Sequence, residues 1–64
     1  MHRYYLTQRP PSLGTIPKGA INIKDYNGKI LTEEIGFEVW GYAEYDKPLT
    51  PKQICNYELM ENEN

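Results

Sequence analysis

The sequence predicts an α+β fold: a three- to four-stranded, mainly antiparallel sheet with one short helix near the C-terminus. Three observations lead there. Apolar and polar residues alternate in several short segments up to residue 46, which is the pattern of half-buried strands. A helix-start signature follows at residue 50. The chain has only 64 residues, enough for one small core, so we expect a single domain over residues 1–60 and a disordered polar tail over residues 61–64.

The first strand is expected over residues 3–8. Its side chains alternate, so Tyr4 and Leu6 fall on one side of the strand and Tyr5 on the other. Two consecutive prolines end this strand because they lack the backbone donor that a sheet needs. Residues 9–19 are then a loop, and a loop this long in a small domain is either functional or mobile.

The dipeptide Asn27-Gly28 predicts a two-residue hairpin turn, because both residues tolerate a positive φ. The turn would pair residues 20–26, where isoleucines alternate with polar residues, with residues 29–34.

The segment from residue 32 to 44 has two interpretations. Its acidic start is compatible with a helix, but Gly36 and Gly41 would each cost about 1 kcal/mol in a helix interior. We therefore favour a strand over residues 37–46. Its two faces would carry Phe37, Val39, Gly41, Ala43 and Tyr45 on one side, and Glu38, Trp40, Tyr42 and Glu44 on the other.

The short helix has the clearest local signal in the chain. Thr50 suits the N-cap, Pro51 suits the first helical position, and Gln53 stands where the partner of a capping box belongs. These residues predict a helix over residues 51–57.

Composition narrows the function classes. The net charge of −2 argues against binding nucleic acid through a general basic field. A lone cysteine, Cys55, forms no internal disulfide, and one cysteine with one histidine, His2, cannot supply four zinc ligands. We expect no cofactor and no metal. The chain shows no signal-like or membrane-spanning apolar run, so we expect a cytoplasmic protein without a membrane partner.

The candidate contact residues are three aromatic side chains and one arginine. Trp40 and Tyr42 would form an exposed patch if the other face of the strand over residues 37–46 is the covered one, and Tyr5 would join it if the first strand pairs alongside. Such residues, together with Arg9 in the loop, are the types that dominate binding hot spots. The alternative is that the helix covers Trp40, which would then belong to the core.

Several segments carry a resemblance to known proteins. They are Tyr5-Leu6-Thr7-Gln8-Arg9-Pro10-Pro11, Gly14, Pro17, Trp40-Gly41 and Tyr45-Asp46-Lys47-Pro48-Leu49-Thr50. In these the chain resembles small proteins encoded on conjugative transposons and phages of low-GC Gram-positive bacteria, and it is also similar to the C-terminal domain of the phage antirestriction protein called defence against restriction A. The resemblance implies a mobile-element context, in which small accessory proteins protect incoming DNA by binding host factors.

Three function hypotheses follow. The first is a non-enzymatic protein-binding module of a mobile element, related to antirestriction, acting as a monomer on an unknown protein partner. The second is a nucleic-acid-binding module in which the aromatic rings stack on bases while Arg3, Arg9 and Lys24 meet phosphates. The third, an enzyme, ranks last because so short a chain encloses a catalytic pocket with difficulty.

Overall fold

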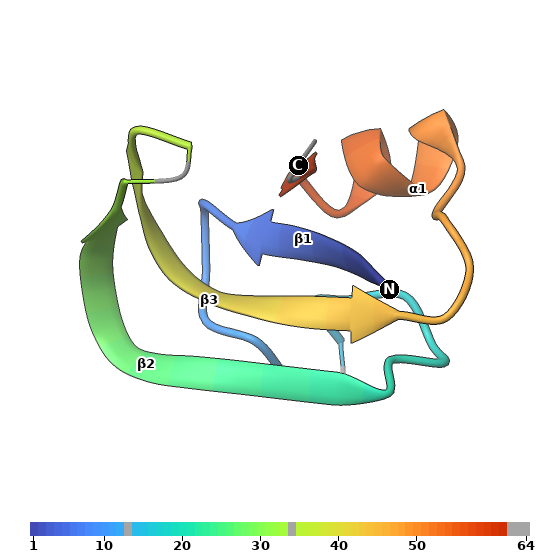
Figure 1. Cartoon of the computed structure of the whole chain (residues 1–64), viewed down its shortest axis with the longest axis horizontal. Coiled ribbons are helices and arrows are strands. Elements are labelled where there is room, and N and C mark those ends of the chain that lie inside the picture. Colours follow the sequence, from blue (N-terminus) through green and yellow to red (C-terminus); the bar gives the residue numbers. More distant parts are fainter. Residues whose placement is uncertain (13, 34, 62–64) are drawn as a thin grey trace.

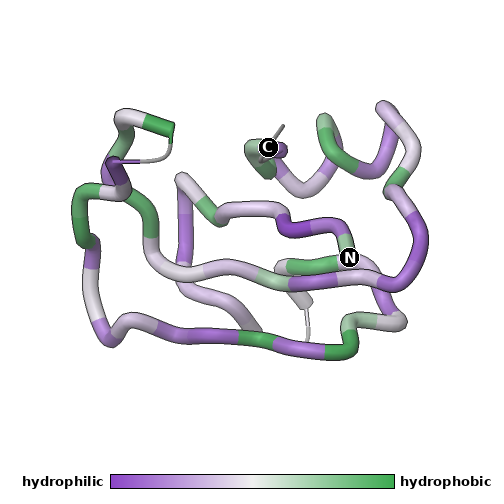
Figure 2. The backbone as a smooth tube through the Cα atoms, in the orientation of Figure 1, coloured by the Kyte–Doolittle hydropathy of each residue, from purple (hydrophilic) through white to green (hydrophobic). Residues whose placement is uncertain are grey.

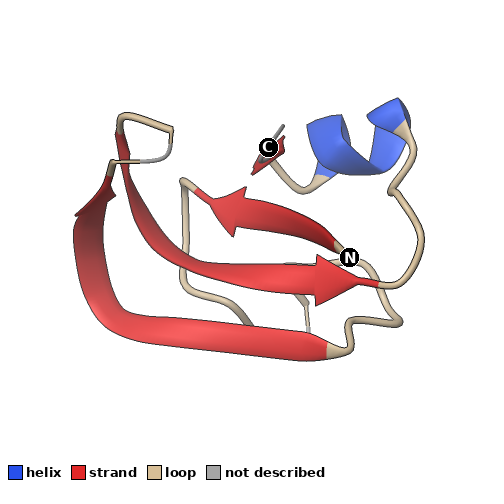
Figure 3. Ribbon diagram, viewed as in Figure 1, coloured by secondary structure: helices blue, strands red, loops and turns tan. Residues whose placement is uncertain are grey.

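The chain folds as one twisted antiparallel sheet with a short helix beside it (Figures 1 and 3). The structure is a computed structural model, and the residues it describes are 1–12, 14–33 and 35–61. The elements are β1 (His2–Leu6), β2 (Asn22–Thr32), β3 (Phe37–Tyr45), α1 (Pro51–Asn56) and β4 (Leu59–Glu61). The strand order is β2-β3-β1-β4. A four-stranded antiparallel sheet with one short helix near the C-terminus confirms the predicted fold class.

The N-terminal strand lies inside the sheet. β1 pairs with β3 on one side, with Tyr4 opposite Ala43, and with β4 on the other, with Leu6 opposite Leu59. β1 runs from His2 to Leu6, so it starts and ends slightly earlier than predicted. The sequence did not reveal β4, which is only three residues long. Residues 62–64 of the expected tail lie outside the described residues.

The predicted hairpin turn at Asn27-Gly28 is wrong. β2 continues through both residues, which adopt positive φ values of 59° and 141° in a bulge. Residues 22–25 and residues 30–32 both pair with β3 rather than with each other. The Asp25 carboxylate accepts a hydrogen bond from the Asn27 amide at 2.8 Å, and β2 bends sharply at this point (Figure 1).

The hairpin turn lies further along, between β2 and β3. The amide of Gly36, at φ 75°, donates to the carbonyl of Thr32 at 2.8 Å. The strand that follows runs from Phe37 to Tyr45, so the strand interpretation of this segment is confirmed.

α1 begins as the sequence predicts. The Thr50 hydroxyl accepts from the Gln53 amide at 3.2 Å, and the Gln53 side chain accepts from the Thr50 amide at 2.9 Å, which completes the capping box. The helix ends at Asn56, one residue earlier than expected. Among the described residues, no helix has the length and apolarity that crossing a membrane requires.

The core lies on one face of the sheet, which we call the covered face. Its buried cluster consists of Tyr4, Leu6, Ile16, Ala43, Tyr45 and Leu59. The loop after β1 contributes Ile16 to this cluster, while Leu49, before α1, and Ile54, in the helix, pack against it. Loop and helix therefore cover the same face, and the opposite face is left to its own side chains.

Candidate partner-binding face

The opposite face of the sheet, which we call the open face, gathers aromatic and charged side chains. The pairing register and ring contacts place on it Arg3, Tyr5, Asn22, Lys24, Tyr26, Lys29, Leu31, Glu38, Trp40, Tyr42, Glu44 and Met60. All four strands contribute to this surface. These residues share one face because side chains alternate along a strand, so every second residue of each strand points to this side of the sheet.

Three tyrosine rings of the open face form a connected cluster centred on Tyr42. Its ring meets that of Tyr5 edge to face at a centroid distance of 6.0 Å, and that of Tyr26 in the same manner at 6.0 Å. Tyr5 is only 1% exposed, whereas Tyr26, Trp40 and Tyr42 are half-buried. Edge-to-face pairs contribute about 0.5–1.5 kcal/mol each beyond area burial. The cluster is therefore an ordered surface that still offers apolar area.

Arg3 contacts two rings of this cluster and an adjacent carboxylate. Its guanidinium lies 4.0 Å from the centre of the Tyr42 ring and forms an ion pair with Glu44 at 3.0 Å. It also donates a hydrogen bond to the Tyr5 hydroxyl at 3.4 Å. The Glu44 carboxylate accepts a further bond from Asn22 at 3.2 Å. The hydrogen bond to Tyr5 and the pairing with Glu44 raise the pKa of the Arg3 guanidinium, so it stays charged wherever the fold exists.

A second cation lies beside the remaining large ring. The Lys29 ammonium is 5.7 Å from the centre of the Trp40 ring, within the range of a cation–π interaction. The Trp40 indole N–H has no hydrogen-bond acceptor among the described residues.

The structure brings together three of the four residues that the sequence suggested as contacts. Tyr5, Trp40 and Tyr42 share the open face, but Tyr5 is almost fully buried there, so the expected exposure of this ring is wrong. Arg9 does not join them, because its guanidinium pairs with the Glu58 carboxylate at 2.6 Å beside the turn that leads into β4. The alternative in which the helix buries Trp40 is wrong, since α1 packs toward the covered face.

Sequence reasoning missed part of the open face. Tyr26 and Lys29 were assigned to the two strands of a hairpin, at either side of its turn, whereas in the structure their side chains contact Tyr42 and Trp40 of β3. The position of Arg3 could have been predicted, because Arg3 and Tyr5 are two residues apart and so lie on the same side of the first strand.

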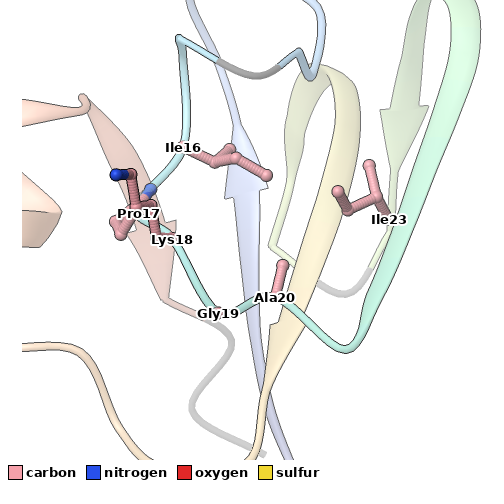
Figure 4. A pocket seen from close by; sticks show the side chains of 6 residues that line it. All are labelled: Ile16, Pro17, Lys18, Gly19, Ala20 and Ile23. Atoms are coloured by element: carbon pink, nitrogen blue, oxygen red, sulfur yellow. The ribbon is translucent and has the colours of Figure 1, made fainter.

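The covered face contains a cleft of about 220 Å³ between the loop and β2 (Figure 4). It is lined by Ile16, Pro17, Lys18, Gly19, Ala20 and Ile23. Lys18 is the one ionisable side chain of this lining, so the cleft suits an apolar group and has no acid–base pair. Elsewhere, no three His, Cys, Asp or Glu residues within the described parts of the chain cluster in a way that could hold a metal ion.

Apolar side chains are also exposed on the outer arm of the β2–β3 hairpin, which is partly hydrophobic in Figure 2. Ile30, Leu31 and Phe37 are each about half exposed or more. They lie beyond the reach of the loop and helix that cover the core.

Fold and surface together define a small α+β domain whose sheet presents one covered face and one aromatic face. Over residues 1–64 the chain matches the family described as defence against restriction A C-terminal, and it belongs to that family. Membership confirms the resemblance to that domain and suggests an antirestriction-related function. Comparison with curated proteins and with solved structures found no match.

Proposed function

We propose that this domain is a non-enzymatic protein-binding module of a mobile genetic element, which serves antirestriction by binding a protein partner through its open face. One observation carries the proposal: Trp40, Tyr26 and Tyr42 are half-buried aromatic side chains on the sheet face opposite the one that the loop and the helix cover. Tryptophan, tyrosine and arginine are the residue types that dominate protein-binding hot spots.

The order of the cluster supports a binding role. Tyr42 is held by two neighbouring rings and by the Arg3 guanidinium, which is itself fixed by Glu44. Side chains that are already ordered lose little conformational entropy when a partner arrives, and each immobilised side chain otherwise costs about 0.5–1.5 kcal/mol. Binding a partner at these half-exposed rings would therefore cost little conformational entropy.

A nucleic-acid-binding module is the second candidate, because Arg3, Lys24 and Lys29 accompany the aromatic rings. Single-strand binding rests on rings whose faces are open to bases. Here one face of Tyr42 is occupied by Arg3, and Tyr5 is almost fully buried. We therefore rank this candidate below protein binding.

The experiment is capture of partners by the tagged protein from a lysate of a low-GC Gram-positive host, with and without nuclease, followed by mass spectrometry. The variant is Trp40→Ala, and the matched control is Phe37→Ala, which removes an aromatic ring that is 52% exposed on the other side of the same strand. We expect a nuclease-resistant host protein that Trp40→Ala loses and Phe37→Ala retains.

Circular dichroism must first establish that both variants fold. A folded Trp40→Ala protein that captures every partner of the wild type would overturn binding through the open face. Loss of all captured material after nuclease would instead favour the nucleic-acid candidate.

A further inference from the structure

The open face has a charge balance opposite to that of the whole chain. Three of the seven Lys and Arg side chains lie on it, namely Arg3, Lys24 and Lys29, against Glu38 and Glu44, which are two of the seven Asp and Glu side chains among the described residues. The chain as a whole carries a net charge of −2. Most acids of the described part of the chain thus lie away from the aromatic rings of this face.

The two lysines of this face are not neutralised. Glu44 is engaged by Arg3 and Asn22, so it does not compensate the charge of Lys24, which lies opposite Tyr42 in the pairing of β2 with β3. Neither Lys24 nor Lys29 forms an ion pair within the described parts of the chain, and both side chains are exposed. Two exposed ammonium groups therefore flank the half-buried rings along β2.

The same face has an unused hydrogen-bond donor. The indole N–H of Trp40 is enclosed and has no acceptor among the described residues. A buried donor without an acceptor costs about 1–3 kcal/mol. Because this nitrogen is enclosed, an acceptor group of a partner would reach it only if the surrounding side chains moved.

From these observations we infer that the partner segment recognised by the open face is acidic and apolar at once: its carboxylates meet Lys24 and Lys29, and its apolar or aromatic side chains pack on Trp40 and Tyr42. This inference rests on the proposed function and adds the chemistry of the partner. Complementary charge at the rim of an apolar contact supplies register and rate of association more than affinity. A polynucleotide would supply the same negative charge, but base stacking needs an open ring face, and Arg3 occupies one face of Tyr42, whereas apolar side chains can also pack against the edge of a ring.

The test is an NMR titration of the ¹⁵N-labelled 64-residue chain with a random glutamate–tyrosine copolymer. A lysine–tyrosine copolymer and single-stranded oligodeoxythymidine serve as comparison probes. The variant Lys24→Glu/Lys29→Glu reverses both charges, and Lys47→Glu/Lys52→Glu makes the same change in net charge at exposed lysines before and within α1. Should the first variant fail to fold, Lys24→Gln/Lys29→Gln replaces it.

We expect the glutamate–tyrosine copolymer to shift the Trp40 indole signal and the amide signals of β2 and β3. The apparent Kd should rise about tenfold in Lys24→Glu/Lys29→Glu and less than about twofold in the control, because two weak ion pairs together contribute on the order of a factor of ten. Higher salt should weaken binding in the wild type.

Binding that is equally weakened in both double variants, or shifts that avoid the open face, would overturn the inference. So would oligodeoxythymidine binding at the open face in preference to the acidic copolymer. The inference can fail separately from the proposed function: if Trp40→Ala abolishes capture of the host protein while Lys24→Glu/Lys29→Glu leaves it intact, the partner chemistry is wrong and the binding face stands.

Discussion

The two faces of the sheet carry nearly the same tyrosine pair, yet they differ in what surrounds it. Tyr4 and Tyr45 meet edge to face at 5.9 Å on the covered face, and Tyr5 and Tyr42 do so at 6.0 Å on the open face, across the same two strands. On the covered face the hydroxyls engage backbone groups, since Tyr45 donates to the Pro17 carbonyl and Tyr4 accepts from the Leu49 amide.

On the open face a charged side chain, Arg3, contacts both rings of the corresponding pair: it lies over Tyr42 and donates a hydrogen bond to the Tyr5 hydroxyl. The comparison teaches that ring geometry alone does not separate a core from a contact surface. The difference comes from the loop and the helix, which close over one pair, whereas Tyr42 of the other pair stays half-exposed beside Arg3.

The largest loss of stability is expected when one tyrosine ring on each face is removed and the two variants are compared. Tyr4→Ala should destabilise the domain by about 3–5 kcal/mol, because Tyr4 is fully buried and its hydroxyl partner would lose its bond. Tyr42→Ala should cost roughly 1–2 kcal/mol, since that ring is half-exposed. Urea unfolding followed by circular dichroism measures both. Equal losses would show that the open face is as much core as the covered one.

The next prediction tests how closely β2 and the loop approach Gly41 of β3. A Cβ at Gly41 would lie 2.1 Å from the Lys24 carbonyl oxygen and 2.8 Å from the Pro11 ring, so Gly41→Ala should cost about 3 kcal/mol through forced separation of β2 and β3. Gly14→Ala is the control, because nothing lies within 4 Å of its added methyl group, and it should change stability by less than about 0.5 kcal/mol. Comparable urea midpoints for the two variants would contradict this close approach.

An intermediate effect concerns alkaline pH. Burial, with smaller contributions from Tyr57 and Tyr4, raises the pKa of Tyr45 to about 12 from an ordinary value of 10.0. The neutral phenol is therefore favoured in the folded state, and its contribution is complete below pH 10 and lost as the pH rises toward 12. Unfolding free energy measured across this window should decline in the wild type. Tyr45→Phe should be less stable at neutral pH and should show a shallower decline; an unchanged slope would rule out Tyr45 as its source.

The smallest effect compares the two ion pairs by double-mutant cycles. Arg3–Glu44 has side chains that are 32% and 14% exposed, whereas those of Arg9–Glu58 are 43% and 49% exposed. The coupling energy should be about 0.5–1 kcal/mol for the first pair and below about 0.5 kcal/mol for the second, because water screens the more exposed charges. The cycles use alanine at each position. A larger coupling for Arg9–Glu58 would reverse the ranking of the two sites.

The features that the sequence predicted well are local ones. The capping residues Thr50 and Gln53 interact within one helical turn, so their pattern sufficed to place α1. Strand β3 was also found, because its alternation extends over the nine residues from Phe37 to Tyr45.

The errors arise where a distant segment decides the outcome. Asn27 and Gly28 do adopt positive φ, as their residue types suggest, but pairing of both halves of β2 with β3 turns the expected hairpin turn into a bulge. β4 is too short to show a period, and its pairing with β1 spans most of the chain.

The candidate site was predictable only as far as alternation reaches. Period-two reasoning put Tyr5, Trp40 and Tyr42 on one side, and the structure agrees. Alternation does not say which side a helix will cover, because both faces of β3 carry large side chains. Arg9 was misplaced because its partner, Glu58, lies far away along the chain.

The bulge in β2 has a consequence for how the protein behaves in concentrated solution. β2 is an edge strand of eleven residues, and a straight, exposed edge of that length is a template on which other chains add strands and aggregate. The bulge separates its ladder into two short stretches, residues 22–25 and residues 30–32. Neither stretch offers a long flat edge, so the bend disfavours the addition of strands from other chains. This matters in a domain that exposes several isoleucines, because exposed apolar strands favour fibre-like self-association.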